Sequence, residues 1–174
     1  LTGFHALIYR YTGATDQIVG TPAANRQHPD TERMVGLFVN PLPLRNKIKP
    51  AAGYRENLWR VQSHVSEAVE HQHTPFEELV QEFQPFRDPS ASPLFQLKFQ
   101  LDRAPRDRIC LPQVELVRMP REVAIARHDL SLDFVENNDG VAGQIEYCSD
   151  LYEPGFVARL ADHYLQLLES AVEA

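Results

Sequence analysis

The chain has 174 residues, of which 43% are hydrophobic and 24% are charged. These are ordinary values for one globular domain, and a domain of this length buries roughly 70% of its unfolded surface. Seventeen basic residues against 24 acidic ones give a net charge of −7. This balance argues against a nucleic-acid groove and against binding to an anionic membrane surface, so neither is expected as a partner.

The cysteines, the apolar runs and the start of the chain indicate the compartment of the protein and whether the chain is a fragment. Cys110 and Cys148 lie far apart and match no metal motif, so we expect free thiols in a reducing, cytoplasmic compartment rather than a disulfide. The sequence shows no run of about 18 apolar residues and no signal peptide. It begins without Met, on Leu1 of a predicted helix, so we expect a fragment of something larger.

The first third of the chain predicts a helix and a strand. Apolar spacing in residues 1–12 indicates a buried helix that ends at Gly13, with one face formed by Phe4, Leu7, Ile8 and Tyr11. Residues 17–21 are β-branched and bounded by turn formers, as in a strand. Residues 23–32 show no period and are predicted as a loop.

Two helices are expected in the middle of the chain. Pro41 and Pro43 first favour an edge or surface passage over a central strand. Residues 51–71 then form the clearest amphipathic pattern, with an apolar face made of Leu58, Val61, Val65, Ala68 and Val69.

The second of these helices has a strong start signal. In the run Thr74-Pro75-Phe76-Glu77, the Thr74 hydroxyl can cap the helix and Pro75 suits its first position. Glu77 can reach back to the cap amide, which completes a capping box. The predicted helix spans residues 75–83.

Strand periodicity dominates the rest of the chain. Residues 94–101 follow a stretch stiffened by three prolines and alternate in polarity, as in a half-buried strand. Residues 113–119 are predicted to form a further strand. Phe76, Phe95 and Phe99 are assigned to the core. The turn Asn137-Asn138-Asp139-Gly140 joins two alternating strands into a hairpin. A last helix starts at Pro154, with an inner face of Phe156, Leu160, Tyr164, Leu167, Leu168, Ala171 and Val172. Together these elements predict an α/β fold, a mixed β-sheet flanked by α-helices on at least one face.

No catalytic constellation emerges from residue types and spacing. His71 and His73 lie two residues apart at a helix end, where solvated or capping histidines are favoured over a metal site. His128-Asp129 resembles a base with its carboxylate, but neighbouring strand residues point to opposite faces and no nucleophile signature is present. We therefore favour a structural role for His128, and no metal is expected.

Four segments together resemble the condensation domains of nonribosomal peptide synthetases. They are Gly20 to Arg26 (GTPAANR), Val35 to Arg45 (VGLFVNPLPLR), His71 to Glu77 (HQHTPFE) and Arg87 to Leu94 (RDPSASPL), in the family's order. Departures are Pro41 for Thr, His73 for Asp, and Ala91-Ser92 for Arg-Asn, which leave the subtype (amide-forming, epimerising, cyclising or ester-forming) open.

The resemblance implies a lobe similar to chloramphenicol acetyltransferase, a CoA-dependent acyltransferase fold of two lobes around a tunnel. The family's catalytic H-H-x-x-x-D-G motif has no match in this chain, which implies that residues 1–174 are the C-terminal lobe and inactive alone. Partners would be the N-terminal lobe of the same domain and peptidyl carrier proteins. Their phosphopantetheine arms would bring a donor thioester and an acceptor amine, with no cofactor bound by this lobe.

Within that picture a few polar residues are candidates to lie near substrate. Asn40, which ends an apolar run, comes first, followed by Thr21, Asn25 and Arg26; turn formation and surface solvation remain the alternative for all four. Arg87 and Asp88 are expected to form a structural ion pair or loop anchor. A non-catalytic scaffold or interaction module derived from the same fold stays open as a second function. A lobe that faces a partner should also expose a contiguous apolar patch.

Overall fold

The computed structural model describes residues 1–84, 92–103, 113–114, 125–138 and 140–173. None of the helices among these residues is both long and apolar enough to cross a membrane. The elements follow in the order α1 (Thr2–Thr12), β1 (Asp16–Ala23), the 3₁₀ helix η1 (Pro29–Arg33), β2 (Asn40–Lys47), α2 (Tyr54–Glu70), α3 (Phe76–Phe83), β3 (Leu97–Arg103), β4 (Leu130–Asn137), β5 (Gly140–Tyr147) and α4 (Pro154–Glu173).

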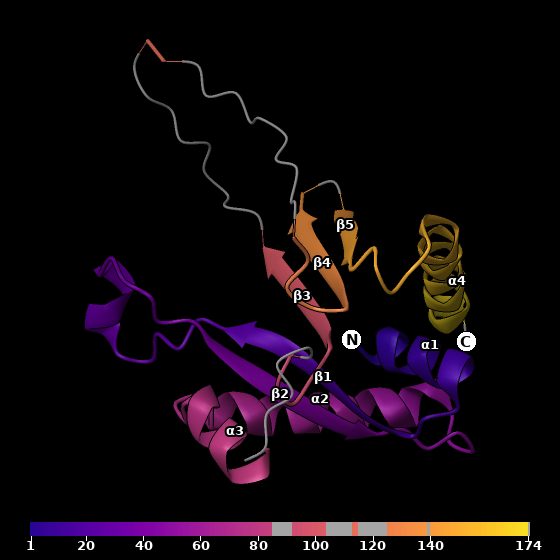
Figure 1. The fold of residues 1–174 in the computed structure, drawn as a ribbon, viewed down its shortest axis with the longest axis horizontal. Coiled ribbons are helices and arrows are strands. Elements are labelled where there is room, and N and C mark those ends of the chain that lie inside the picture. The colour runs from indigo at the N-terminus through magenta and orange to yellow at the C-terminus, as the bar shows by residue number, and fades with distance from the viewer. Residues whose placement is uncertain (85–91, 104–112, 115–124, 139, 174) are drawn as a thin grey trace.

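The five strands form one mixed sheet in the order β2-β1-β3-β4-β5 (Figure 1). β3 runs parallel to both of its neighbours, β1 and β4. β2 pairs antiparallel with β1, and β5 pairs antiparallel with β4. The mixed sheet with flanking helices is therefore confirmed. Pro41 and Pro43 lie in β2, which is an edge strand, as their missing amide donors require.

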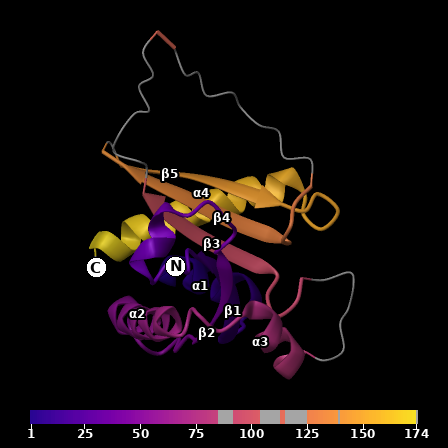
Figure 2. The same ribbon diagram turned by 90° about the vertical axis from the view of Figure 1, so that its left-hand side faces the viewer.

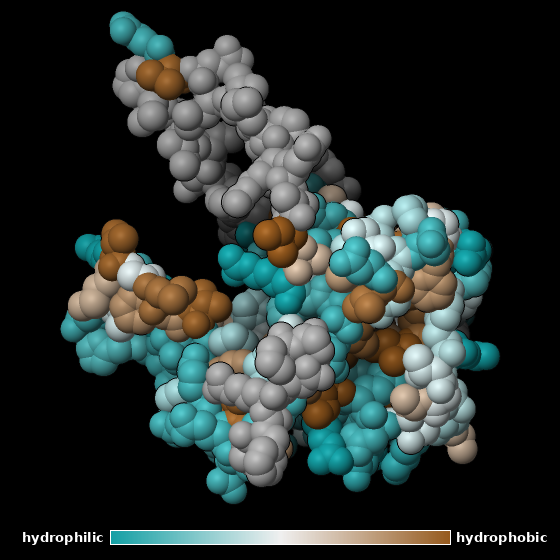
Figure 3. Space-filling model, viewed as in Figure 1, coloured by the Kyte–Doolittle hydropathy of each residue, from teal (hydrophilic) through white to brown (hydrophobic). Residues whose placement is uncertain are grey.

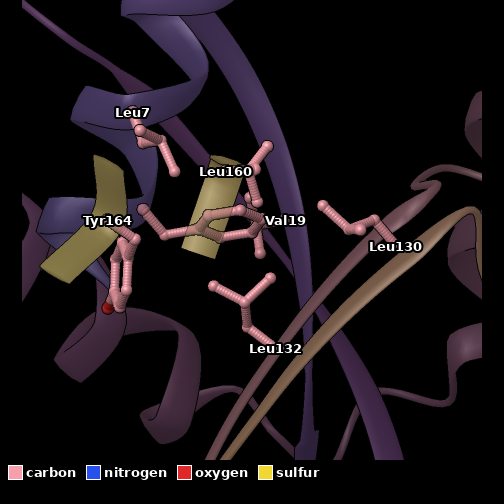
Figure 4. Packing of buried hydrophobic residues seen from close by; sticks show 7 residues of the cluster. Leu7, Val19, Leu130, Leu132, Leu160 and Tyr164 are labelled. Carbon is pink, nitrogen blue, oxygen red and sulfur yellow. The ribbon is translucent and has the colours of Figure 1, made fainter. Parts of the chain in front are cut away.

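Helices α1 and α4 cover one face of the sheet, as Figures 1 and 2 show, while α2 and α3 pack beside β2. The core lies between the sheet and helices α1 and α4 (Figure 4). Its buried residues are Phe4, Leu7, Val19, Leu130, Leu132, Leu160 and Tyr164. Gly13 ends α1 in the left-handed conformation, with φ of 72° and its amide bonded to the Tyr9 carbonyl. The predicted helix 1–12 and its stop are confirmed, but Tyr11, which the prediction placed on the buried face, is 39% exposed.

The hairpin and the last helix also follow the prediction. β4 and β5 pair residue by residue from Leu130 with Tyr147 to Asn137 with Gly140, so the hairpin turns where the run Asn137 to Gly140 predicted it. In α4 the predicted inner face holds for Leu160 and Tyr164, but Val172 is exposed because the helix end extends beyond the core.

Strand β3 begins three residues later than the alternation predicted. Leu94 has a positive φ of 63°, and the Phe95 amide bonds to the Pro93 carbonyl at 2.8 Å, so the chain turns before the strand starts. Phe95 is buried and packs its ring against Phe76, while Phe76 and Phe99 are half-buried.

The predicted apolar face of α2 is wrong in part. Leu58 and Val69 are 44% and 43% exposed, whereas Asn57 and Val61 are buried. The Asn57 side chain bonds to both the amide and the carbonyl of Lys49, each at 3.0 Å. With these hydrogen bonds in place, the face of α2 that carries Asn57, rather than Leu58, points toward the interior.

The predicted capping box of α3 is also wrong. The helix starts at Phe76 with Pro75 as its N-cap, and neither Thr74 nor Glu77 provides a side-chain cap. Instead Asn40, from β2, accepts the Phe76 amide at 3.1 Å and donates to the carbonyls of Gln72 and Thr74 at 2.9 and 2.7 Å. A residue distant in sequence thus satisfies the amide that the local rule assigned to Thr74.

The predicted loop 23–32 contains the beginning of η1, which the His28 side chain caps by accepting the Asp30 amide. Arg87, Asp88 and most of the predicted strand 113–119 lie outside the described residues.

Candidate functional site

The sheet face opposite α1 and α4 is polar. The register of β3, β4 and β5 aligns Lys98 with Ser131 and Glu146 in one row, and Gln100 with Asp133 and Gln144 in the next. Because side chains alternate along a strand, these residues point away from the core that contains Leu132. We call this surface of β3, β4 and β5 the open face; α1 and α4 lie on the opposite side of the sheet (Figures 1 and 2).

A pocket of about 320 Å³ lies on the open face, between β1 and β3. Its apolar side includes Phe76, Pro93 and Phe95, and its polar side is formed by Lys98, Gln100, Arg127, His128, Ser131 and Glu146. A larger hollow of about 660 Å³ lies on the other side of the sheet, where α1 and α4 contribute to its lining, and it includes none of the four substrate-proximal candidates. The open-face pocket is therefore the candidate site.

The floor of the pocket is the Phe95 ring lying over Gly20 of β1, and it depends on the missing side chain of this glycine. A Cβ at this position would lie 2.0 Å from the Phe95 ring, far inside any allowed contact. The ring can cross β1 only where the strand has no side chain. The glycine of the GTP motif thus has a packing reason in this chain.

Charge on the open face is balanced. Lys98 Nζ lies 2.7 Å from Asp133 Oδ1, and the two side chains are only 22% and 23% exposed. Such a pair holds the lysine stem in place along the pocket wall, and the carboxylate offsets its charge. The site therefore offers fixed polar groups without a strong net charge.

His128 adds a neutral imidazole to the same wall. Its ring packs against Phe95 with centroids 5.3 Å apart. Burial lowers the pKa of His128 below its usual value, and the positive charge of Lys98 lowers it further, while Glu146 opposes both. Its Nδ1 is buried and has no hydrogen-bond partner in the described part of the chain. Asp129 therefore does not orient the ring as a catalytic carboxylate would.

Of the four predicted substrate-proximal residues, Thr21 lines the pocket. Asn25 adopts a positive φ of 50° where the chain leaves β1, a conformation that Asn tolerates well. Asn40 is 8% exposed and fastens α3 to β2 through the three bonds described above.

Arg26 organises the loop between β1 and β2. Its guanidinium donates to the carbonyls of Thr31, Met34 and Gly36 and lies 4.2 Å above the Phe38 ring. The loop, residues 24–39, projects from the sheet as an arm (Figure 1). Figure 3 shows hydrophobic side chains gathered along it, and the exposed ones are Met34, Val35, Leu37 and Val39.

Sequence reasoning missed a buried polar network on the helix side. His5 is fully buried; its Nδ1 lies 2.8 Å from Gln17 Oε1 and its Nε2 lies 3.0 Å from Asn46 Nδ2. Asn46 Oδ1 in turn accepts from His64 Nδ1 at 2.9 Å. Burial lowers the pKa of His5 to about 4, so the ring is neutral and joins α1, β1, β2 and α2. Polar residues within otherwise apolar segments were the available signal.

The histidines near the end of α2 have a structural role. His71 is the C-cap residue of α2, and its Nδ1 donates to the Glu67 carbonyl at 2.9 Å. Its ring stacks on His73 with centroids 6.5 Å apart. Of the solvated or capping histidines expected at this helix end, His71 is a capping one.

The geometry thus gives a site that can hold and orient a ligand, with paired charges and a neutral donor or acceptor. Comparison with known proteins identifies its family: the family model described as "Condensation domain" matches residues 1–174. The chain belongs to the condensation-domain family.

Its relatives are large synthases. The chain is 41% identical over 170 residues to tyrocidine synthase 3 of Brevibacillus parabrevis, covering 98% of this chain and 3% of that protein. It is 35% identical over 171 residues to surfactin synthase subunit 1 of Bacillus subtilis (strain 168), covering 98% of the chain and 5% of the relative. The chain therefore spans only a few per cent of the length of these curated relatives.

Solved structures share the fold. The X-domain from teicoplanin biosynthesis is 28% identical with a TM-score of 0.89, and the match covers 99% of this chain and 40% of that one. A four-domain nonribosomal peptide synthetase, holo-AB3403, matches with a TM-score of 0.85 at 21% identity, over 98% of this chain and 14% of the other. The sheet and helices described above are thus those of the condensation-domain fold, which is chloramphenicol acetyltransferase-like.

Proposed function

We propose that residues 1–174 form the C-terminal lobe of a nonribosomal peptide synthetase condensation domain. The lobe helps to form the amide bond between a carrier-tethered donor thioester and an acceptor amine. One observation carries this proposal: the family match spans the whole chain, yet the chain covers 39% of a solved condensation domain and 40% of a solved X-domain. The remaining three-fifths of such a domain leave room for a second lobe.

The two sides of the sheet support this assignment. The helix-covered side has a continuous apolar core, as a lobe needs in order to fold. The open face carries the polar rows and the pocket, which suits one wall of a tunnel through which tethered chains pass. The exposed apolar side chains of the arm, Met34, Val35, Leu37 and Val39, suit contact with the partner lobe.

The chemistry is assigned to the other lobe. The motif H-H-x-x-x-D-G is absent from this sequence, and His128 lacks a carboxylate at its buried Nδ1. This lobe binds and orients, because its site holds fixed polar groups rather than a nucleophile with an activating base. Peptidyl carrier proteins deliver both substrates on phosphopantetheine in the cytoplasm, and the lobe itself binds no cofactor.

The four substrate-proximal candidates act at two levels in this proposal. Thr21 lies on the pocket wall and contacts the substrate. Arg26 and Asn25 shape the arm that contacts the partner lobe, and the Asn40 side chain places α3 beside the pocket through its bonds to backbone groups.

The decisive experiment compares this chain with the longer protein that contains both lobes. Carrier proteins loaded with a donor and an acceptor amino acid are mixed with each, and dipeptide formation is followed by mass spectrometry. We expect product from the two-lobe protein and none from residues 1–174 alone. Turnover by the 174-residue chain would show that the assignment of the chemistry to the other lobe is wrong.

A non-catalytic interaction module is the second candidate. The similarity to the teicoplanin X-domain favours it, since a further solved structure, with a TM-score of 0.87, is the complex of that X-domain with OxyB. The sequence upstream of Leu1 separates the two functions. An H-H-x-x-x-D-G motif about one lobe earlier supports the enzyme, and a two-lobe protein that binds partners without turnover supports the module.

A further inference from the structure

His128 stands at a place in the pocket where its chemistry is constrained. It lies two residues before β4, and its ring is one of the polar groups on the pocket wall. The Phe95 ring packs against it, and Phe95 is itself held by Gly20 beneath. The imidazole therefore has a fixed position, although nothing in the described residues bonds to its Nδ1.

The buried, unpaired Nδ1 of His128 determines which ring nitrogen carries the proton. Buried N–H groups without an acceptor are rare and costly, whereas an unpaired lone pair is better tolerated. The neutral ring therefore keeps its single proton on Nε2. Since Nδ1 is buried, the ring reaches the pocket through its other edge, and it presents Nε2–H there as a hydrogen-bond donor.

This arrangement differs from that of a general base. A histidine that abstracts a proton through Nε2 needs its Nδ1–H held by a carboxylate or carbonyl, so that the imidazolium is stabilised. At His128 no described group accepts from Nδ1. The charged groups that act on the ring are Lys98, Glu146, Asp129 and Arg127, and burial together with Lys98 keeps its pKa low and the ring uncharged.

The ligand group that fits is a neutral carbonyl. Lys98 is paired with Asp133 at 2.7 Å, and the second cation of the lining, Arg127, is matched in number by the carboxylate of Glu146, so the pocket has no excess positive charge that would favour a carboxylate. A volume of about 320 Å³ is at the lower end of the roughly 300–1,000 Å³ of ligand pockets, which suits one residue-sized group.

We propose that His128 is a positioning residue whose Nε2–H donates a hydrogen bond to a carbonyl of the carrier-tethered acyl chain in this pocket. The inference rests on the proposed function, because only that function brings a tethered acyl chain to the open face. It names the group that the pocket recognises and a residue that sets its orientation.

Two isosteric variants test the assignment of the nitrogen. His128→Gln places an amide N–H near the position of Nε2, whereas His128→Asn places one near Nδ1. In the intact two-lobe protein we expect kcat/KM for condensation to fall less than threefold in the Gln variant and about tenfold in the Asn variant, the loss of one neutral hydrogen bond. Equal values in the two variants, or a larger loss in the Gln variant, would overturn the inference. Equal melting temperatures exclude a folding defect.

A binding measurement separates failure of this inference from failure of the proposed function. The probe is the pantetheine thioester of N-acetylalanine, added to the 174-residue chain carrying ¹⁵N-labelled histidine. We expect the His128 signals of the Nε2–H tautomer, with Nε2 shifted by the probe in the wild-type chain. An Nδ1–H tautomer, or no response to the probe, overturns the inference even if the two-lobe protein is active. The expected shift supports it even if condensation fails.

Discussion

The two faces of the sheet are built from the same strands yet have opposite characters. On β4, Leu130 and Leu132 point into the core beneath α1 and α4, while Ser131 and Asp133 point to the open face. Strand alternation alone separates them, since neighbouring residues face opposite sides. The contrast teaches that one face gives stability and the other is available for binding.

The contrast predicts its largest effect for a core truncation. Leu132→Ala removes a side chain with no exposed surface and is expected to lower the free energy of unfolding by about 2–5 kcal/mol. Gln144→Ala, on the open face of the neighbouring strand β5, should change it by less than about 0.5 kcal/mol. Urea denaturation measures both, and similar losses would contradict the division between the faces.

The helix side should also account for the acid sensitivity of the fold. The pKa of His5 is lowered to about 4 from 6.5, so the unfolded chain binds the proton more tightly. Stability is then complete above pH 6.5 and falls as the pH drops towards 4, by up to about 3 kcal/mol. His5→Gln should flatten this dependence of the unfolding free energy on pH, whereas His128→Gln should leave most of it. The opposite result would place the sensitive histidine on the open face.

Packing beneath the pocket gives the next effect. In Gly20→Ala the new Cβ would meet the Phe95 ring, and overpacking of this kind costs about 1–3 kcal/mol. Gly155→Ala, near the start of α4, meets only the flexible end of Arg159 at 3.7 Å and should stabilise the chain by up to about 0.5 kcal/mol. Thermal unfolding compares them, and a harmless Gly20→Ala would show that Phe95 does not hold the pocket floor.

The smallest effect concerns the cap of α3. Asn40→Ala leaves the Phe76 amide without its acceptor and should cost about 1–2 kcal/mol. Thr74→Ala should cost less than about 0.5 kcal/mol, because the bonds of Thr74 at this junction, to Asn40 and to the His71 carbonyl, are made by its backbone and survive the substitution. If Thr74→Ala is the more damaging substitution in denaturant titrations, the local capping box operates after all.

Much of the fold can be predicted from local sequence signals. The hairpin at Asn137 and Gly140, the stop at Gly13 and the edge prolines of β2 all depend on neighbouring backbone geometry, and all were predicted. Predictions failed where a distant residue competes with a local rule. Asn40 replaces the cap that Thr74 could have given, because tertiary packing brings β2 against α3.

The candidate site was harder to predict than the fold. Thr21 lies on the pocket, and its motif indicated it. Lys98 meets Asp133 and lies near His128 only because β3 and β4 pair in one register, which no single segment encodes. The motifs placed the chain in its family, while the rows of the open face required the folded sheet.

The central claim is that substrate passes along the open face and not along the helix-covered side. A matched pair of glutamine substitutions tests it in the two-lobe protein: Gln100→Trp fills the open-face pocket, and Gln166→Trp fills the hollow beside α4. Condensation of carrier-bound substrates should fall by an order of magnitude or more in Gln100→Trp and stay near the wild-type rate in Gln166→Trp. Equal rates in both variants, or a selective loss in Gln166→Trp, would contradict the account.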